Sequence, residues 1–330
     1  MGHRTGWAGA FAAALLLALA TRAPAAEPPA KAAAAPGTLR ILAKARQMST
    51  YNLGTRFEVG TQDITFEAPA AYQSSFDFWA SRMKGQKRSE VCDITTITQG
   101  VEESGDVPFR RTIPRFDIEV LQGGQIYAPG LNIGKALAAF AWEGSLDRYG
   151  NVKEMRRVEG TESDEIKALA IPEMSHIFPE IAESHDLKVG EGFKDERIVR
   201  LPTKLTIAGL EHVTIKWTRE YILKSQDAGI ATFEVKTTYA TDPAFKPEME
   251  RTTCQVSGSG TGEATFEVKR GVFLSSRLPS TMHIEIEAPL RPLPEHPETE
   301  VSGTGKSHVL LDLLLTGEQT VKRVWGDDTD

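Results

Sequence analysis

The chain has 330 residues and a formal net charge of −7, with its Lys and Arg residues spread along the sequence rather than gathered in a run. An acidic chain without a basic segment is a poor candidate for binding nucleic acid. It contains two cysteines and no Cys-x-x-Cys motif, which argues against thiol redox catalysis.

The N-terminus has the features of a secretion signal. The apolar run GAFAAALLLALA, at residues 9–20, is too short to span a bilayer, and small residues at 23–25 suit signal cleavage. We expect residues 1–25 to be a signal peptide and residues 26–37, rich in Pro and Ala, to be a linker. The alternative for the apolar run is a short buried helix. The signal predicts an exported protein, periplasmic or extracellular, with no transmembrane segment in the mature chain and no cysteine placed for an N-terminal lipid anchor.

Alternation of apolar and polar residues dominates the rest of the chain and predicts antiparallel strands with one solvated face. Residues 213–223 show it most clearly, because every second residue is apolar except Arg219. Other strands with this pattern are expected around residues 64–66, 116–120, 231–235, 264–268, 282–286 and 306–316.

Helical signals are few and central. Residues 132–142 and 161–170 each suit a short helix, and Pro172 and Pro179 limit the second. The predicted fold class is mainly β (α+β): a curved antiparallel sheet or half-barrel of two β-meander groups, with one or two short helices packing on its concave face.

One β-rich domain is expected over residues 38–320. Its two related halves, about 38–160 and 186–320, would be joined by a helical segment at 161–185. Residues 321–330 are expected to form a disordered tail. Whether the two strand groups share one sheet stays open at this point.

Two similar segments suit hairpins: LDRYGNVKEM at 146–155 and FEVKRGVFLS at 266–275. Gly150 and Gly271 stand where a tight turn needs a positive φ. We interpret both segments as turns of the sheet rather than as places of chemistry.

These hairpins, with FPE at 178–180, LKVGEGF at 187–193 and GEATFEVKRGVFLS at 262–275, resemble an uncharacterised family of exported bacterial proteins and lipoproteins. The resemblance covers roughly residues 146–286, and weakly the region from residue 38. Glu191 stands for the family's Asp, Phe193 for its Trp, and the lipid-anchor cysteine is missing. The resemblance implies a curved antiparallel sheet wrapped over helices, similar to the periplasmic lipoprotein-carrier fold. The family has no assigned activity, so no catalytic residue can be carried over.

No motif points to catalysis or to a cofactor. His176 and His185 have no spacing that suits metal ligands, and there is no Gly-x-Ser-x-Gly motif. The Gly-rich run at 257–262 is followed by a strand rather than by the helix that a phosphate-binding loop needs, so its glycines indicate strand curvature or a bulge. We therefore predict no catalytic residue, no metal and no cofactor.

Four aromatic residues on apolar strand faces are the candidate ligand-binding residues: Trp217, Tyr221, Phe233 and Phe266. They could line a cavity in the concave face for an apolar or amphiphilic ligand such as a lipid, or they could simply pack on the helices.

The two cysteines, Cys92 and Cys254, could form a disulfide that joins the halves, or remain unpaired buried thiols.

The sequence favours a non-enzymatic envelope protein that binds such a ligand. The alternative is a structural or assembly protein that binds an envelope protein through a sheet edge or the Pro-rich connector at 289–297. A hydrolase with scattered catalytic residues is a distant third.

Overall fold

The structure is a computed structural model. It describes residues 38–67, 73, 77–78, 80–81, 83–122, 125–128, 139–160, 179, 181, 183–205, 210–247, 252–289 and 306–326. The predicted signal peptide, the linker and nearly all of the segment at 161–185 lie outside the described residues.

Long antiparallel strands form almost all of the described part. The strands are β1 (Leu39–Ile41), β2 (Ser49–Glu67), β3 (Lys87–Thr98), β4 (Val107–Gln122), β5 (Gln125–Ala128), β6 (Ala141–Leu146), β7 (Val152–Glu159), β8 (His185–Leu187), β9 (Gly192–Leu205), β10 (Leu210–Asp227), β11 (Ile230–Thr241), β12 (Thr253–Glu267), β13 (Val272–Pro289) and β14 (Lys306–Gly326).

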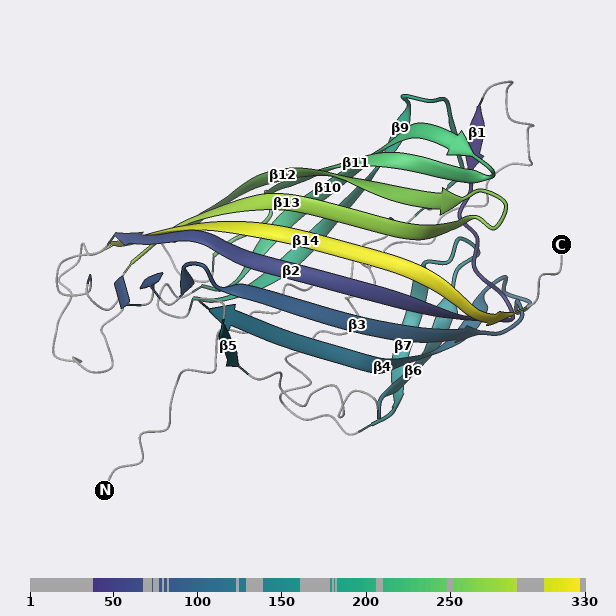
Figure 1. Cartoon of the computed structure of the whole chain (residues 1–330), viewed down its shortest axis with the longest axis horizontal. Coiled ribbons are helices and arrows are strands. Elements are labelled where there is room, and N and C mark those ends of the chain that lie inside the picture. Colours follow the sequence, from purple (N-terminus) through teal and green to yellow (C-terminus); the bar gives the residue numbers. More distant parts are fainter. Residues whose placement is uncertain are drawn as a thin grey trace.

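Both strand groups belong to one sheet. Its strand order is β7-β6-β4-β3-β2-β14-β13-β12-β11-β10-β9, with β5 added beside β4. The N-terminal group joins the C-terminal group where β2 pairs with β14, the two longest strands of the sheet. The sheet is strongly curved, so that strands near its two edges, such as β7 and β10, lie behind β2 and β14 in Figure 1. The mainly β fold class with a curved antiparallel sheet is confirmed.

The structure differs from the sequence-based expectations at three places. Ala141 and Trp142, the end of the helix expected at 132–142, begin β6, and most of the remainder lies outside the described residues. Strand β14 continues to Gly326, into the tail expected to be disordered, because its backbone pairs with β2 as far as Ser49. A helical stretch that was not predicted lies between β2 and β3. Its described residues are 73, 77, 78, 80, 81 and 83.

Buried positions alternate along β3 and β11, because successive side chains of a strand point to opposite sides of the sheet. We call the buried side the inner face. Three core clusters of buried residues are found in the described part, the smallest of which consists of Ala45, Val107, Phe109 and Leu146. One spans β9 to β13 and includes residues of β1 and β8. Another is formed mainly by β2, β3, β4 and β6.

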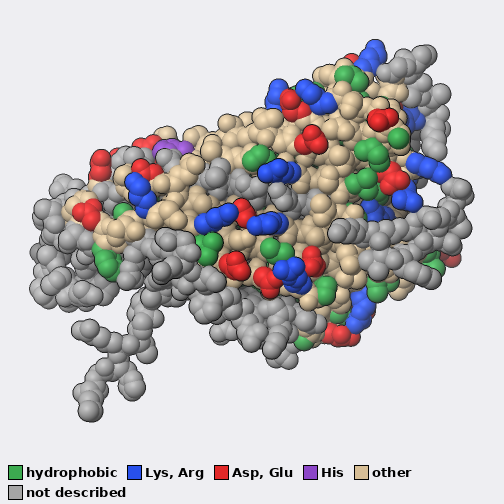
Figure 2. All heavy atoms as spheres, viewed as in Figure 1, with side chains coloured by type: hydrophobic (Ala, Val, Ile, Leu, Met, Phe, Trp, Pro, Cys, Tyr) green, Lys and Arg blue, Asp and Glu red, His purple; other side chains and the backbone are tan. Residues whose placement is uncertain are grey.

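The outer face carries charged residues of both signs. Glu58 of β2 pairs with Arg56 at 2.8 Å and with Lys87 at 2.9 Å, and Arg115 of β4 pairs with Asp117 at 2.6 Å. Figure 2 shows Lys, Arg, Asp and Glu side chains interspersed on one side of the molecule, with hydrophobic side chains scattered among them. Such a surface is typical of a solvated sheet face.

The two predicted hairpins are confirmed as turns. The first joins β6 to β7, with Gly150 at φ 87°, and the second joins β12 to β13, with Gly271 at φ 65°. Both hold the segment between β1 and β2. The Lys44 N–H donates to the Gly271 carbonyl at 2.8 Å, and the Ala45 N–H donates to the Arg148 carbonyl at 2.9 Å. The repeated hairpins thus fix the chain that leads from β1 into the sheet.

Candidate functional site

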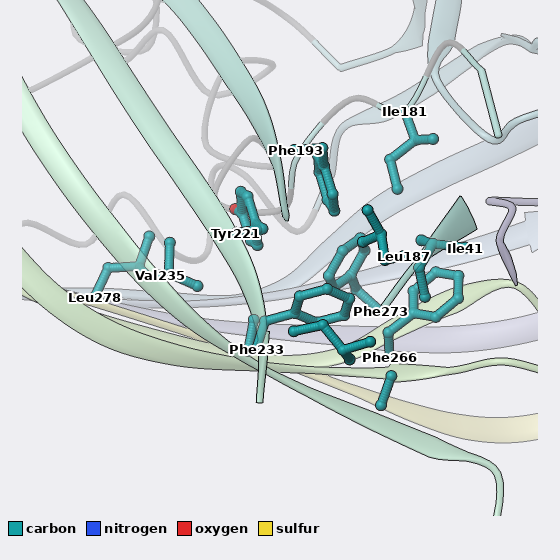
Figure 3. Close-up of a cluster of buried hydrophobic side chains, with 13 residues drawn as sticks. Ile41, Ile181, Leu187, Phe193, Tyr221, Phe233, Val235, Phe266, Phe273 and Leu278 are labelled. Carbon is teal, nitrogen blue, oxygen red and sulfur yellow. The ribbon is translucent and has the colours of Figure 1, made fainter. Parts of the chain in front are cut away.

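A group of stacked aromatic rings fills the inner face of the C-terminal half (Figure 3). Tyr221 lies parallel to Phe193 with ring centroids 5.0 Å apart and meets Phe233 edge-on at 6.3 Å. Phe273 contacts Phe266 at 5.0 Å and Phe233 at 6.3 Å. These contacts define what we call the aromatic cluster.

The aromatic cluster is covered by the small β1–β8 sheet. Ile41 of β1 is fully buried, as is Ile181, which precedes β8, and Leu187 of β8 is 6 % exposed. All three belong to the same core as the rings (Figure 3). Among the described residues, β1, β8 and Ile181 therefore cover these aromatic side chains. Short helices were expected to cover them.

The four predicted ligand-binding residues lie on this face, but in different surroundings. Tyr221, Phe233 and Phe266 are fully buried in the aromatic cluster. Trp217 is only partly buried and packs against the edge of the cluster. The cluster is thus packed by its own side chains, and the more accessible end is at Trp217.

Next to the aromatic cluster, between Tyr221 and Trp217 along β10, the inner face becomes polar. Asp195 of β9 accepts hydrogen bonds from Arg219 of β10 and, at 3.3 Å, from Nε of Arg197. Arg219 is fully buried, and Asp195 is 7 % exposed. One carboxylate thus accepts hydrogen bonds from two guanidinium groups.

The pairing register brings these residues together. Arg219 stands directly opposite Asp195 on one side and Thr237 of β11 on the other. In the next row, Trp217 stands between Arg197 and Tyr239. We call Asp195, Arg197, Arg219 and Thr237, on strands β9 to β11, the buried polar band.

Aromatic faces support the buried charge. The guanidinium carbon of Arg219 lies 4.3 Å from the ring centroid of Trp217, which is a cation–π contact. Trp217 in turn stacks with Tyr239, with ring centroids 6.1 Å apart. Trp217 therefore contacts both the aromatic cluster and the buried polar band.

A strip without side chains borders the band. Gly258, Gly260 and Gly262 of β12 stand opposite β11, and a Cβ on any of them would come within 2.3 Å of a backbone oxygen of β13. The expectation of a tightly curved strand at 257–262 agrees with this close approach. Tyr239 lies over the strip, and its hydroxyl is 2.9 Å from that of Ser280 on β13.

Several buried polar atoms near the band have no hydrogen-bond partner among the residues that the structure describes. They are the indole N–H of Trp217 and the hydroxyl groups of Tyr221, Thr237 and Ser276. An unsatisfied buried polar group costs about 1–3 kcal/mol. These unpartnered donors therefore favour the binding of a ligand that supplies acceptor oxygens.

The phenols of the site are donors at neutral pH. Burial raises the pKa of Tyr221 to about 12, although nearby Arg219 opposes this. Burial also raises the pKa of Tyr239 to about 12, against the effect of its hydrogen bond with Ser280. Both hydroxyl groups remain protonated, and neither is suited to act as a general base near pH 7.

The cysteines lie apart from this site. Cys92 on β3 and Cys254 on β12 are both free thiols, and strands β2, β14 and β13 separate them in the sheet. Neighbouring strands are about 4.8 Å apart, so the separation exceeds the reach of a disulfide. The disulfide considered from the sequence is not formed in the structure.

Sequence reasoning missed the polar half of the site. It treated Arg219 as an exception on an apolar face and gave no role to Asp195, Arg197, Thr237 or Tyr239. The available signal was the alternation of Phe193, Asp195, Arg197 and Val199, which places two charges on a face that also holds apolar residues.

Comparisons with known proteins leave the family open. No family model matches the chain, and no curated protein matches it. One solved structure with partial similarity is the outer membrane protein OprG from Pseudomonas aeruginosa. It has 7 % sequence identity and a TM-score of 0.20, and the match covers 85 % of this chain and 99 % of that one. The resemblance to the exported family and its carrier-like fold stays a prediction.

In the described part of the chain, no group of three or more His, Cys, Asp or Glu residues is arranged to hold a metal ion. No helix among the described residues has the length and apolar character needed to cross a membrane.

Proposed function

We propose that this chain is a non-enzymatic, exported envelope protein that binds an amphiphilic ligand on the inner face of its sheet. The observation that carries the proposal is the set of unpartnered buried donors at Trp217, Tyr221 and Thr237, next to a buried ion pair and contiguous with the aromatic cluster. The ligand head would lie in the buried polar band, and its apolar part along the partly buried rings of Trp217 and Tyr239.

The donors near the band indicate the nature of the head. The indole N–H of Trp217 and the hydroxyl groups of Tyr221 and Thr237 can all donate hydrogen bonds. A head with acceptor oxygens, neutral or anionic, satisfies them, whereas an ammonium group, which can only donate, would leave them unsatisfied. The preferred ligand is therefore an oxygen-rich amphiphile such as a fatty acid or an acidic lipid.

Export is part of the proposal and rests on the N-terminal sequence. The apolar run at 9–20 and the small residues at 23–25 support a signal peptide. An extracytoplasmic lipid-binding protein is consistent with the resemblance of residues 146–286 to exported proteins. That resemblance supports the proposal and does not name a ligand.

A second candidate function is assembly with another envelope protein. The edge strand β9 pairs with β10 on one side, and no described strand pairs with its other side. It spans Gly192–Leu205, and Ile198 on it is 40 % exposed. An edge of this length can accept a strand from a partner.

Native mass spectrometry on protein purified from an exporting host tests the first candidate. We expect an added mass of lipid size that is lost on denaturation. Trp217→Phe, which removes the indole N–H, and Thr237→Val, which removes the hydroxyl, should both lower the bound fraction. Trp142→Phe is the matched control, because Trp142 is buried in a different core cluster.

Two results would contradict these expectations. A mass that stays free of added ligand after incubation with envelope lipids would refute the ligand-binding proposal and leave the assembly candidate. A bound mass that Trp217→Phe and Thr237→Val both leave unchanged would refute the assignment of the site.

A further inference from the structure

A second buried ion pair lies on the inner face in the N-terminal half of the chain. Arg88 and Glu90 of β3 are joined by a contact of 2.5 Å between Nη2 and Oε1, and their side chains are 9 % and 8 % exposed. The pair is distinct from the buried polar band, because strands β2, β14, β13, β12 and β11 stand between β3 and β10 in the sheet.

The guanidinium group of Arg88 is only partly satisfied. Its Nη2 contacts Glu90, but in the described part of the chain the buried Nε and Nη1 have no hydrogen-bond partner. A guanidinium carries one N–H on Nε and two on Nη1, in a fixed plane. Donors are therefore available in directions that the Glu90 carboxylate does not occupy.

The side chains directly opposite Arg88 on the two neighbouring strands supply no acceptor. Val59 of β2 and Val120 of β4 are its directly opposed cross-strand neighbours. Both side chains are purely aliphatic. Burial lowers the pKa of Arg88 and raises that of Glu90, so the surroundings disfavour both charges. An additional acceptor would stabilise the guanidinium.

We propose that Arg88 is the centre of an oxyanion-binding site, with Glu90 holding the guanidinium in a fixed orientation. The group recognised is a phosphate or a carboxylate, because both present oxygens that match the planar N–H groups of arginine. Either a free small molecule or a lipid headgroup carries this chemistry. The site does not depend on the function proposed above.

Calorimetric titration and thermal unfolding with inorganic phosphate test the site, at an ionic strength held constant with chloride. We expect phosphate to bind the unmodified protein and to raise its melting temperature. Arg88→Gln should abolish both effects. Glu90→Gln should lower the Kd for phosphate by about fivefold or more, because a negative charge next to the anion is removed.

Arg111→Gln is the matched control. Arg111 is also buried on this face, but its Nε donates to Thr96 at 3.3 Å. This variant should keep the response to phosphate, and so should Trp217→Phe, which separates this site from the ligand site of the C-terminal half.

Two further ligands identify the natural source of the group. Acetate tests the carboxylate, and dihexanoylphosphatidic acid tests a phosphate that carries acyl chains. Tighter binding of the lipid than of inorganic phosphate would assign the site to a headgroup. Equal binding would assign it to the free anion.

The proposal fails if neither phosphate nor acetate binds the unmodified protein, or if binding survives Arg88→Gln. Should Arg88→Gln not fold, Glu90→Gln decides, since an unchanged or weaker affinity for phosphate in that variant contradicts an oxyanion site at Arg88.

Discussion

Arg219 of β10 and Asp195 of β9 are directly opposed cross-strand partners and form an ion pair buried in the inner face of the sheet. Most of the other large side chains buried nearby are aromatic or aliphatic. The carboxylate also accepts a hydrogen bond from Arg197. Breaking this pair would take a close opposite charge away from the remaining buried group, in a medium that solvates charge poorly.

Removing one member of the pair should therefore destabilise the fold strongly. We expect Asp195→Asn or Arg219→Met to lower the free energy of unfolding by about 3–5 kcal/mol, the range for removing one member of a buried ion pair. Urea denaturation followed by tryptophan fluorescence measures it.

The double variant Asp195→Asn/Arg219→Met should recover part of the loss, because the two single changes are coupled. The exposed pair of Lys224 and Glu234, at 3.2 Å, is the control. Its removal by Lys224→Met should cost less than about 1 kcal/mol. Additive effects of the two buried changes would contradict the coupling.

The glycine strip of β12 gives a prediction about shape. A Cβ at position 260 would lie 2.1 Å from the carbonyl oxygen of Pro279, which is backbone of the neighbouring strand. We expect Gly260→Ala to lower the free energy of unfolding by about 2 kcal/mol or more, since β12 and β13 must separate.

Gly100→Ala is the control for the glycine prediction. The atom nearest to a Cβ at position 100 is Sδ of Met48, at 3.9 Å, and the glycine has no positive φ. This change should stay within about 0.5 kcal/mol of the unmodified protein. Equal stability of the two variants in chemical denaturation would show that the strip tolerates side chains.

How far the sequence predicts this structure depends on the range of the interaction. Alternation over 213–223 predicts which residues of β10 share a face, because side-chain direction follows from the chain itself. The partner of Arg219 could not be predicted in the same way. It depends on the register of β9 against β10, and an irregularity between Leu210 and His212 shifts that register along the pair.

The range of the interaction also explains why the β1–β8 sheet that covers the aromatic cluster was not predicted. Residues 39–41 and 185–187 are each too short to show a period, so no strand was predicted there. They pair with each other across more than a hundred residues of sequence. Only the tertiary structure brings these two short segments together.

The two thiols should react slowly. Burial raises the pKa of both Cys92 and Cys254 to about 12. Since the thiolate is the reactive form, the fraction that can react at pH 8 is very small. We expect little labelling by Ellman's reagent in the native protein and two equivalents after unfolding without a reductant. Labelling of two equivalents only after reduction would reveal a disulfide and contradict the separation of β3 and β12.

His185 makes the cover of the aromatic cluster sensitive to pH. It belongs to β8, opposite Ile41 of β1, and its ring stacks on Phe193 with centroids 4.7 Å apart. Burial lowers its pKa below the usual 6.5, although Glu183 opposes this. Between the folded pKa and 6.5, the unfolded chain binds more protons than the folded chain. The contribution of His185 to the free energy of unfolding is therefore fully present above about pH 6.5 and decreases as the pH falls below that value. Below the folded pKa it no longer changes with pH.

His185→Phe should remove this dependence, because phenylalanine keeps the stacked ring without a titratable group. Denaturation curves between pH 5 and pH 8 should show the unmodified protein losing more stability than His185→Phe as the pH falls through about 6.5. Arg40 and Asp186, which form a 2.8 Å ion pair between β1 and β8, are present in both proteins, so the difference isolates the histidine. Parallel pH profiles for the two proteins would mean that His185 titrates equally in the folded and unfolded chains.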